Sequence, residues 1–358
     1  MKHVIIGLCA AVGLLLVGTV SAQNEVSPLC PNPVSVQGFK TCANVIKAEQ
    51  EGEVVFYSPD VEQGTVKVLQ AFKVSFPKIN TKYIRLQTGA LYSKLMAERQ
   101  ARSYLVDVVN LSDVGLALDF QKRGGYQYYR SPEMAAYESR FKSKPEGYFT
   151  WGCVIMAGIA YNPATTSAAD APKDWTDINN PRWAGRVNVK SANSGLQHTT
   201  WYLMRNLFGK DFWTRFTAQK PHAFDSYVQQ YDRLSNGEDK LAVTAQYSGF
   251  LEFKAKGAPI EFVVPTSGLP SGPEVVGVVS NAPHPEAARL FLDWFLSPIG
   301  QKVNADAIFN YSARADVEPP PGGIPLSKMK LLVPDDWDEY LKSRKDFIEL
   351  WGKISGLR

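Results

Sequence analysis

The stretch Glu53-Val54-Val55-Phe56-Tyr57-Ser58-Pro59-Asp60 decides the fold, because a buried strand ends here in a turn and a helix follows over residues 65–76. The rest of the chain repeats this pattern, with small polar residues after the predicted strands. Such strand ends expose backbone N–H groups at helix N-termini, where a small anion can be held. The pattern therefore predicts an α/β protein whose binding site lies at the strand ends.

Alternating strands and helices continue along the chain. Leu105-Val106-Asp107-Val108-Val109 is a continuous apolar run of the kind found in buried parallel strands. The alternation implies right-handed crossovers and a mostly parallel sheet. Further strands are predicted over 82–86, 186–189, 241–244 and 275–279, and helices are predicted to begin near Pro285 and to cover 337–354.

Two segments interrupt this alternation. Residues 125–151 are rich in aromatic side chains and are predicted to be extended, as the first crossing between two lobes. Residues 265–273 are predicted to be the return crossing. The length of the chain also suits two lobes of about 100–200 residues each.

Residues 1–22 have the features of a secretory signal peptide. Lys2 supplies a positive charge, residues 4–17 form an apolar stretch too short for a comfortable bilayer span, and Val20-Ser21-Ala22 predicts cleavage after Ala22. The prediction is a protein exported to the periplasm, and an uncleaved membrane anchor is the alternative. Cys9 is a poor lipidation site because bulky Leu8 precedes it.

Charge and cysteine content exclude several classes of protein. The chain has 39 basic and 35 acidic residues without a basic stripe, which argues against a nucleic-acid partner. Cys30 and Cys42 are predicted to pair in an oxidising compartment, whereas Cys153 is predicted to be a buried apolar residue. The cysteines lack the spacing of a zinc site, and no cofactor is expected.

Several segments of residues 50–315, in matching order, carry a family resemblance. The chain resembles the ferric-ion-binding-protein-like family of periplasmic solute-binding proteins, which serve ABC importers. Its most specific segments are Asn281-Ala282-Pro283-His284-Pro285-Glu286-Ala287-Ala288 and Ser297-Pro298-Ile299-Gly300-Gln301. The others are Val54-Val55-Phe56-Tyr57-Ser58, Asp107-Val108-Val109-Asn110, Gly158-Ile159-Ala160-Tyr161-Asn162, Trp183-Ala184-Gly185-Arg186-Val187, and Asn236-Gly237-Glu238 before Tyr247.

The resemblance implies a type II periplasmic-binding-protein fold, with two α/β lobes, two extended crossovers and a ligand cleft that closes by a hinge. Its partners would be the permease and ATPase subunits of an ABC importer, and a monomer is expected because the lobes must move freely. The predicted division is a signal peptide over 1–22, an arm over 23–50, lobe 1 over 51–128 and 272–315, lobe 2 over 129–271, and a tail with a helix over 316–358.

Iron-binding members of this family hold the ion with a histidine, an acidic residue and two adjacent tyrosines. The matching positions here are Val61, Asp113, Tyr247 and Ser248, so two of the four ligands are missing. The departure implies the branch that binds small anions or zwitterions, such as a phosphonate, a sugar phosphate or an organic acid. Iron held with a synergistic anion is the alternative, and Asp113 and Tyr247 would then be its ligands.

The predicted ligand-binding residues follow the strand ends and the family positions. Hydroxyl and backbone N–H groups would hold the anion, although several of these residues could equally be helix caps. Asp113 would require a cationic or hydroxyl group on the solute, and Trp151 could equally belong to the hinge core. The full set is Ser58, Thr88, Gly89, Ser112, Asp113, Trp151, Ser191, Ser194, Gly195, Tyr247 and Ser248.

A secreted hydrolase is the alternative from another class of protein. The sequence around Ser194 lacks the preceding glycine of a nucleophile elbow, and the chain has neither an H-E-x-x-H motif nor a phosphate-binding P-loop. The expectation is therefore a binding protein without catalytic residues.

Overall fold

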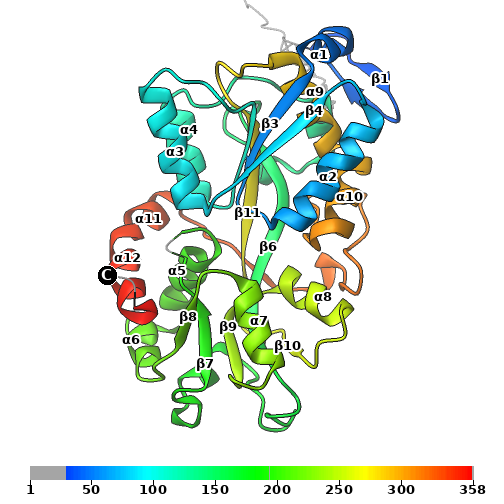
Figure 1. The fold of residues 1–358 in the computed structure, drawn as a ribbon. Coiled ribbons are helices and arrows are strands. Elements are labelled where there is room, and N and C mark those ends of the chain that lie inside the picture. Colours follow the sequence, from blue (N-terminus) through cyan, green and yellow to red (C-terminus); the bar gives the residue numbers. More distant parts are fainter. Residues whose placement is uncertain (1–29, 193, 357–358) are drawn as a thin grey trace, which may run out of the picture.

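The computed structural model describes residues 30–192 and 194–356, so the predicted signal peptide and its cleavage site lie outside the described residues. Two lobes lie one above the other in Figure 1, and each has β-strands with helices packed around them. Two long strands in the middle of the picture run between the lobes. No helix among the described residues is long and apolar enough to cross a membrane.

One sheet continues through both lobes in the order β4-β3-β5-β11-β6-β9-β7-β8, while β10 pairs with β6 and β12 pairs with β11. The pairs among β3, β4 and β5 in lobe 1 and among β7, β8 and β9 in lobe 2 are parallel, as predicted. The strands are β1 (Val34–Val36), β2 (Phe39–Thr41), β3 (Glu53–Ser58), β4 (Asn80–Arg85), β5 (Val108–Leu111), β6 (Thr150–Tyr161), β7 (Val187–Lys190), β8 (His222–Phe224), β9 (Leu241–Gln246), β10 (Glu261–Val263), β11 (Leu269–Val278) and β12 (Leu331–Leu332).

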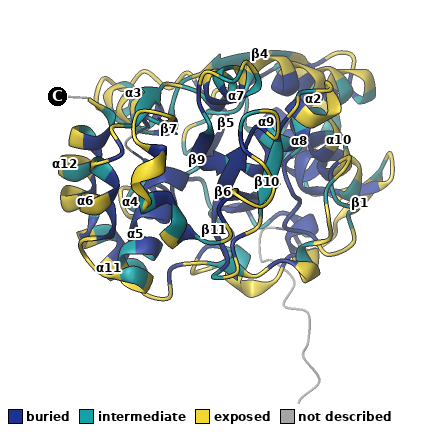
Figure 2. Cartoon of the chain, turned by 90° about the horizontal axis from the view of Figure 1, so that it is seen from below, coloured by how far each residue is buried: buried dark blue, intermediate teal, exposed yellow. Residues whose placement is uncertain are grey.

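Helices cover the sheet in both lobes, and Figure 2 shows buried strands in the interior with the exposed helix faces outside. In lobe 1 the helices are α1 (Val45–Glu51), α2 (Glu62–Ser75), α3 (Thr88–Gln100), α4 (Val114–Lys122), α9 (Pro285–Leu296) and α10 (Pro298–Ile308). Those on lobe 2 are α5 (Leu196–Phe208), α6 (Phe212–Thr217), α7 (Tyr227–Ser235), α8 (Tyr247–Ala255), α11 (Trp337–Lys342) and α12 (Arg344–Ser355).

The cores of the two lobes are dominated by aromatic side chains. In lobe 1, the ring of Phe72 in α2 lies 5.1 Å from Phe291 and 5.4 Å from Trp294 of α9. In lobe 2, Trp213 of α6 lies 5.4 Å from Trp351 of α12. The second contact attaches the C-terminal helices to lobe 2, beside α5 and α6 in Figure 1.

The first crossing differs from the prediction in its position, whereas the predicted return crossing over 265–273 overlaps β11. β6 and β11 pair antiparallel and are buried along their whole length, and they carry the chain between the lobes. Residues 129–149, which the sequence analysis assigned to the crossing and to lobe 2, pack on lobe 1 instead. Tyr129 donates to Asp293 and Tyr137 donates to the carbonyl of Leu296, so these aromatic residues are buried against α9.

The N-terminal and C-terminal segments both have more structure than an arm and a tail. Cys30 and Cys42 form the predicted disulfide, with their Cα atoms 5.6 Å apart. Cys153 is buried and unpaired, as expected. The predicted single helix over 337–354 is instead the pair α11 and α12, which meet at Ser343.

Candidate functional site

A cavity lies between the lobes at the carboxyl ends of the parallel strands. Its volume is about 60 Å³, several times the ~10–15 Å³ that one ordered water molecule needs. Ligands of α/β sheets commonly bind at such strand ends. The residues with polar side chains that line the cavity are Asp60, Arg85, Gln87, Thr88, Ser112, Lys190, Ser194, Gln197, Ser226, Tyr227, Gln246 and Glu274.

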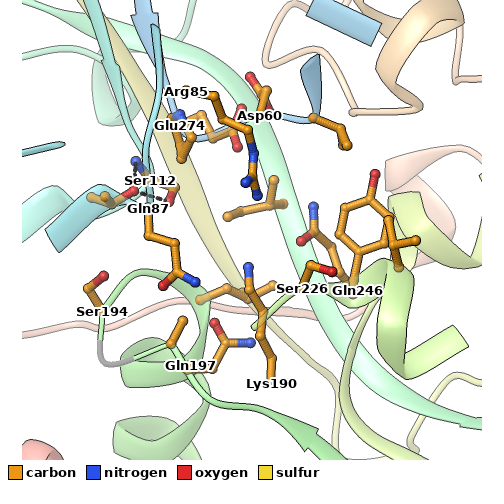
Figure 3. A pocket seen from close by; sticks show the side chains of 18 of the residues that line it. Asp60, Arg85, Gln87, Ser112, Lys190, Ser194, Gln197, Ser226, Gln246 and Glu274 are labelled. Atoms are coloured by element: carbon orange, nitrogen blue, oxygen red, sulfur yellow. Dashed lines mark hydrogen bonds between the residues drawn. The ribbon is translucent and has the colours of Figure 1, made fainter. Parts of the chain in front are cut away.

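Two cationic side chains enter this cavity from opposite lobes. Arg85 is the last residue of β4 in lobe 1, and Lys190 is the last residue of β7 in lobe 2. Figure 3 shows both side chains reaching into the space between them. Neither forms an ion pair with any described residue. Burial, and then the positive charge of Arg85, lower the pKa of Lys190, and a bound anion would oppose both effects.

Neutral hydrogen-bonding groups surround the two cations. The hydroxyls of Thr88 and Ser112, both in lobe 1, lie 2.6 Å apart. In lobe 2, Ser194 lies just before helix α5 and Gln197 lies in its first turn, and both line the cavity. Gln87 donates from Nε2 to the backbone carbonyl of Asp225 across 3.0 Å, and this bond joins the two lobes at the edge of the cavity.

Two carboxyl groups, Asp60 and Glu274, lie beside Arg85 in Figure 3 and hydrogen-bond to each other. Burial raises the pKa of both groups, and the charge of Asp60 raises the pKa of Glu274 further. Asn110 donates to both carboxyl groups over 3.2 Å, and the thiol of Cys153 donates to Glu274 over 3.0 Å.

Three of the sequence-predicted site residues line the cavity, namely Thr88, Ser112 and Ser194. Others lie next to lining residues without reaching the cavity themselves. Ser58 donates to Oδ2 of Asp60 over 2.9 Å, and Ser248 accepts from Nε2 of Gln246 over 2.8 Å. Gly89 follows Thr88 in the first turn of α3, and Ser191 follows Lys190.

Asp113 and Gly195 contact each other instead of the cavity. Oδ1 of Asp113 accepts from the N–H of Leu116, as an N-cap of α4 does. Oδ2 accepts from the N–H of Gly195 over 3.0 Å and from Arg344 over 2.7 Å. Asp113 is not among the residues that line the cavity, and its Oδ2 is directed toward lobe 2.

Tyr247 and Trp151 lie in aromatic clusters outside the lining of the cavity. The ring of Tyr247 lies 4.7 Å from Phe262 and 6.0 Å from Tyr311, and Trp151 lies 4.9 Å from Phe141. Asp113 and Tyr247, the ligands of the iron alternative, are therefore engaged elsewhere. The described residues contain no group of three or more His, Cys, Asp or Glu side chains that could hold a metal ion.

The charged groups of the cavity, Arg85, Lys190, Asp60 and Glu274, are absent from the set of site residues predicted from the sequence. A signal existed for the two cations, because each lies within one residue of the end of a predicted strand. Arg85 fell inside the predicted strand 82–86, whereas β4 ends at Arg85. Lys190 directly follows the predicted strand 186–189, whereas β7 ends at Lys190. Glu274 gave no such signal, since it lies within a crossing strand.

Comparisons of the sequence and of the structure both find similarity to solute-binding proteins. Residues 104–341 match the profile of a family described as bacterial extracellular solute-binding protein. A probable ABC transporter periplasmic-binding protein of Sinorhizobium fredii is 25% identical over 293 residues, which cover 77% of each chain. The periplasmic binding protein AfuA of Actinobacillus pleuropneumoniae, with fructose-6-phosphate bound, superposes with a TM-score of 0.75 at 22% identity, over 86% of this chain and 99% of that one. Iron-bound HitA of Pseudomonas aeruginosa superposes with a TM-score of 0.73 at 20% identity, over 84% and 99% of the two chains.

Proposed function

Since this chain belongs to the family of bacterial extracellular solute-binding proteins, we propose that it captures a small anionic or zwitterionic solute for an ABC importer. The candidate solutes are a phosphonate, a sugar phosphate or an organic acid. The lobes close on the solute, and the closed protein delivers it to the permease in the membrane. We further propose that the mature protein is a periplasmic monomer that begins after cleavage at Ala22.

The convergence of Arg85 and Lys190 from opposite lobes carries this proposal. Two like charges in one partly buried space oppose closure of the cleft, and an anion between them converts this repulsion into two attractions. Charge-assisted hydrogen bonds to an anionic oxygen are also stronger than neutral ones. An anionic solute therefore favours the closed protein, which is what a receptor of this kind requires.

The neutral part of the cavity suits a solute with further polar groups. The amides of Gln87, Gln197 and Gln246 can donate to and accept from hydroxyl groups. Asp60 and its partner Glu274 both line the cavity, and Asp60 can accept a hydrogen bond from a hydroxyl or an ammonium group. This arrangement supports a solute that carries hydroxyl or amino groups beside its anionic group.

The relative with fructose-6-phosphate bound supports a phosphorylated solute, whereas the iron-bound relative raises the iron alternative. The alternative has less support, because Asp113 binds Arg344 and Tyr247 packs among aromatic rings. We propose no catalytic step, since the described lining residues hold and orient a solute without a paired nucleophile and base.

Isothermal titration calorimetry on the mature protein tests the proposal. The panel contains inorganic phosphate, 2-aminoethylphosphonate, glucose 6-phosphate, citrate, ferric citrate and the neutral sugar glucose. At least one anion is expected to bind. Arg85→Gln and Lys190→Met should each weaken that binding by about 10- to 100-fold, the usual effect of losing a charged hydrogen bond.

Two exposed residues provide matched controls. Arg215 and Lys78 lie outside the cavity and form surface ion pairs with Asp211 and Glu49. Arg215→Gln and Lys78→Met should keep the affinity of the unaltered protein. Binding of glucose alone, or an affinity for the anion that survives both cavity substitutions, would refute the proposal.

A further inference from the structure

We propose that Asp113 and Arg344 form a latch between the lobes, through which the C-terminal helices α11 and α12 set the affinity of the cleft without touching the solute. The inference concerns regulation of the site described above and rests on the proposed function for its solute. The positioning role falls to α11 and α12, which follow the last strand of the sheet, β12.

The two residues of the latch belong to different lobes. Asp113 follows β5 and caps α4, so it moves with lobe 1. Arg344 begins α12, whose buried residues Phe347 and Trp351 pack in the aromatic core of lobe 2. Trp351 also donates from Nε1 to the carbonyl of Lys190 over 3.2 Å. The helix that carries Arg344 therefore also supports one of the two cavity cations.

The contact between the lobes has the geometry of a specific, buried ion pair. Nη1 of Arg344 lies 2.7 Å from Oδ2 of Asp113, whose side chain has no exposed surface, while that of Arg344 is 22% exposed. Burial opposes ionisation of Asp113, but Arg344 and the N–H of Gly195 outweigh it and hold the pKa of this carboxyl below its ordinary value. The carboxylate of Asp113 therefore accepts hydrogen bonds from the charged Arg344 and from the neutral N–H groups of Gly195 and Leu116.

Around this ion pair, the backbones of the two lobes approach each other closely. Gly195 has a φ of +64°, and a Cβ atom there would lie 2.7 Å from the carbonyl oxygen of Ser112 in lobe 1. A Cβ atom on Gly115 of α4 would lie 2.4 Å from a methyl group of Leu341 in α11. The two glycines allow lobe 1 to approach α5 and α11 closely enough for the side chains of the latch to meet.

The face of lobe 2 that receives Asp113 is well ordered by its own contacts. The ring of His198 stacks on Tyr340 at 4.1 Å and on Phe347 at 4.8 Å, and its Nε2 lies 3.0 Å from the hydroxyl of Ser343. Ser343 separates α11 from α12 and precedes Arg344. These contacts fix the start of α12, which carries Arg344, within lobe 2, and such fixing lowers the entropy cost of forming the ion pair.

Opening of the cleft would separate Asp113 from both Gly195 and Arg344, and each charge would then be hydrated. A buried ion pair competes with the hydration of its two ions, so its net contribution to closure is moderate. The latch therefore shifts the equilibrium between open and closed lobes without locking it. Because a solute that binds the closed form has to supply any missing closure energy, loss of the latch weakens its apparent affinity.

The test compares Arg344→Gln with Lys345→Gln, which removes the same charge from the next residue of α12, an exposed one. Small-angle X-ray scattering without solute measures closure, and calorimetry with the best-binding anion of the panel measures affinity. Arg344→Gln should give a larger radius of gyration and an affinity about fivefold or more weaker, within the range of known couplings between sites. Lys345→Gln should match the unaltered protein, and Arg344→Lys should recover part of the effect.

A second variant guards against a failure of Arg344→Gln to fold. Asp113→Asn keeps a good N-cap residue for α4 but removes the carboxylate charge, and it should open the lobes in the same direction. Unchanged scattering and unchanged affinity in both variants would refute the latch. If the unaltered protein binds no anion of the panel, the proposed solute class fails, and the scattering curves alone then decide whether the latch exists.

Discussion

The hydroxyl of Thr41 donates to Oδ2 of Asp293 across 2.6 Å, and this bond joins β2 near the N-terminus to α9 of lobe 1. Tyr129 donates to the same oxygen from a third segment of the chain. The carboxyl of Asp293 is buried, and burial raises its pKa from 3.8 to about 7 despite these hydrogen bonds. Asp293 therefore makes the stability of lobe 1 depend on pH.

The expected sign follows from the raised pKa. The folded protein binds the proton of Asp293 more tightly than the unfolded chain does, so this group stabilises the fold fully below about pH 4, and the stabilisation is lost as the pH rises to about 7. Relative to Asp293→Asn, the unaltered protein should lose about 4 kcal/mol of unfolding free energy between pH 4 and pH 8. Urea unfolding at several pH values measures this difference. The exposed Asp306→Asn is the control, and a difference independent of pH would contradict the prediction.

The disulfide between Cys30 and Cys42 closes a short loop, with a sequence separation of 12. A loop of this size should contribute about 3 kcal/mol at most by restricting the unfolded chain. The double variant Cys30→Ser, Cys42→Ser should lower the unfolding free energy by up to that amount and leave the solute affinity unchanged. Dithiothreitol should lower the stability of the unaltered protein but not that of the variant. A loss of affinity without a loss of stability would show that the disulfide acts on the cleft.

Trp351 links the packing of the C-terminal helices to the cavity. Its side chain is fully buried, and its indole contacts Trp213 and the carbonyl of Lys190. Trp351→Ala should cost about 3–5 kcal/mol of stability, as other large-to-small core substitutions do, and should also weaken solute binding. Ile348→Ala, at a partly exposed position of the same helix, is the control for both measurements. If Trp351→Ala loses stability but keeps its full affinity for the solute, α12 does not influence the cleft.

Thr88 and Tyr247 distinguish the cavity from the site predicted by the sequence. Thr88 lines the cavity and bonds Ser112, whereas Tyr247 packs against Phe262. Thr88→Val should weaken solute binding by about 2- to 10-fold, the usual effect of one neutral hydrogen bond. Tyr247→Phe should leave it unchanged, although the family resemblance predicts a role for this tyrosine. Calorimetry on both variants gives the answer, and the reverse pattern would favour the family positions.

The family resemblance and the two-lobed α/β fold are confirmed. Both could be predicted because they depend on local patterns. Apolar runs such as the one before Ser58 and the proline at the start of α9 mark their elements without reference to distant residues. The first crossing was less predictable. The aromatic residues after Tyr126 are as apolar as a crossing strand, and only their contacts with α9 show that they stay on lobe 1.

The site depended on information that local patterns do not contain. A shift of one residue in the predicted end of β4 was enough to hide Arg85. Asp113 and Arg344 are 231 residues apart, so no spacing rule could pair them. The sequence predicts a ligand role for Asp113, but a strand-end pattern contains no information on whether the charge faces the solute or the other lobe.

The division of the two cavity cations between lobes has a consequence for how tightly any solute can be held. Lobe 1 supplies Arg85 and lobe 2 supplies Lys190, and the strands β6 and β11 connect the two lobes covalently. A solute held by one lobe therefore meets the other at an effective concentration on the order of millimolar or higher, without a second bimolecular encounter. In the proposed binding mode, capture is an intramolecular chelation, and its strength depends on how these two strands bend as well as on what the cavity residues contact.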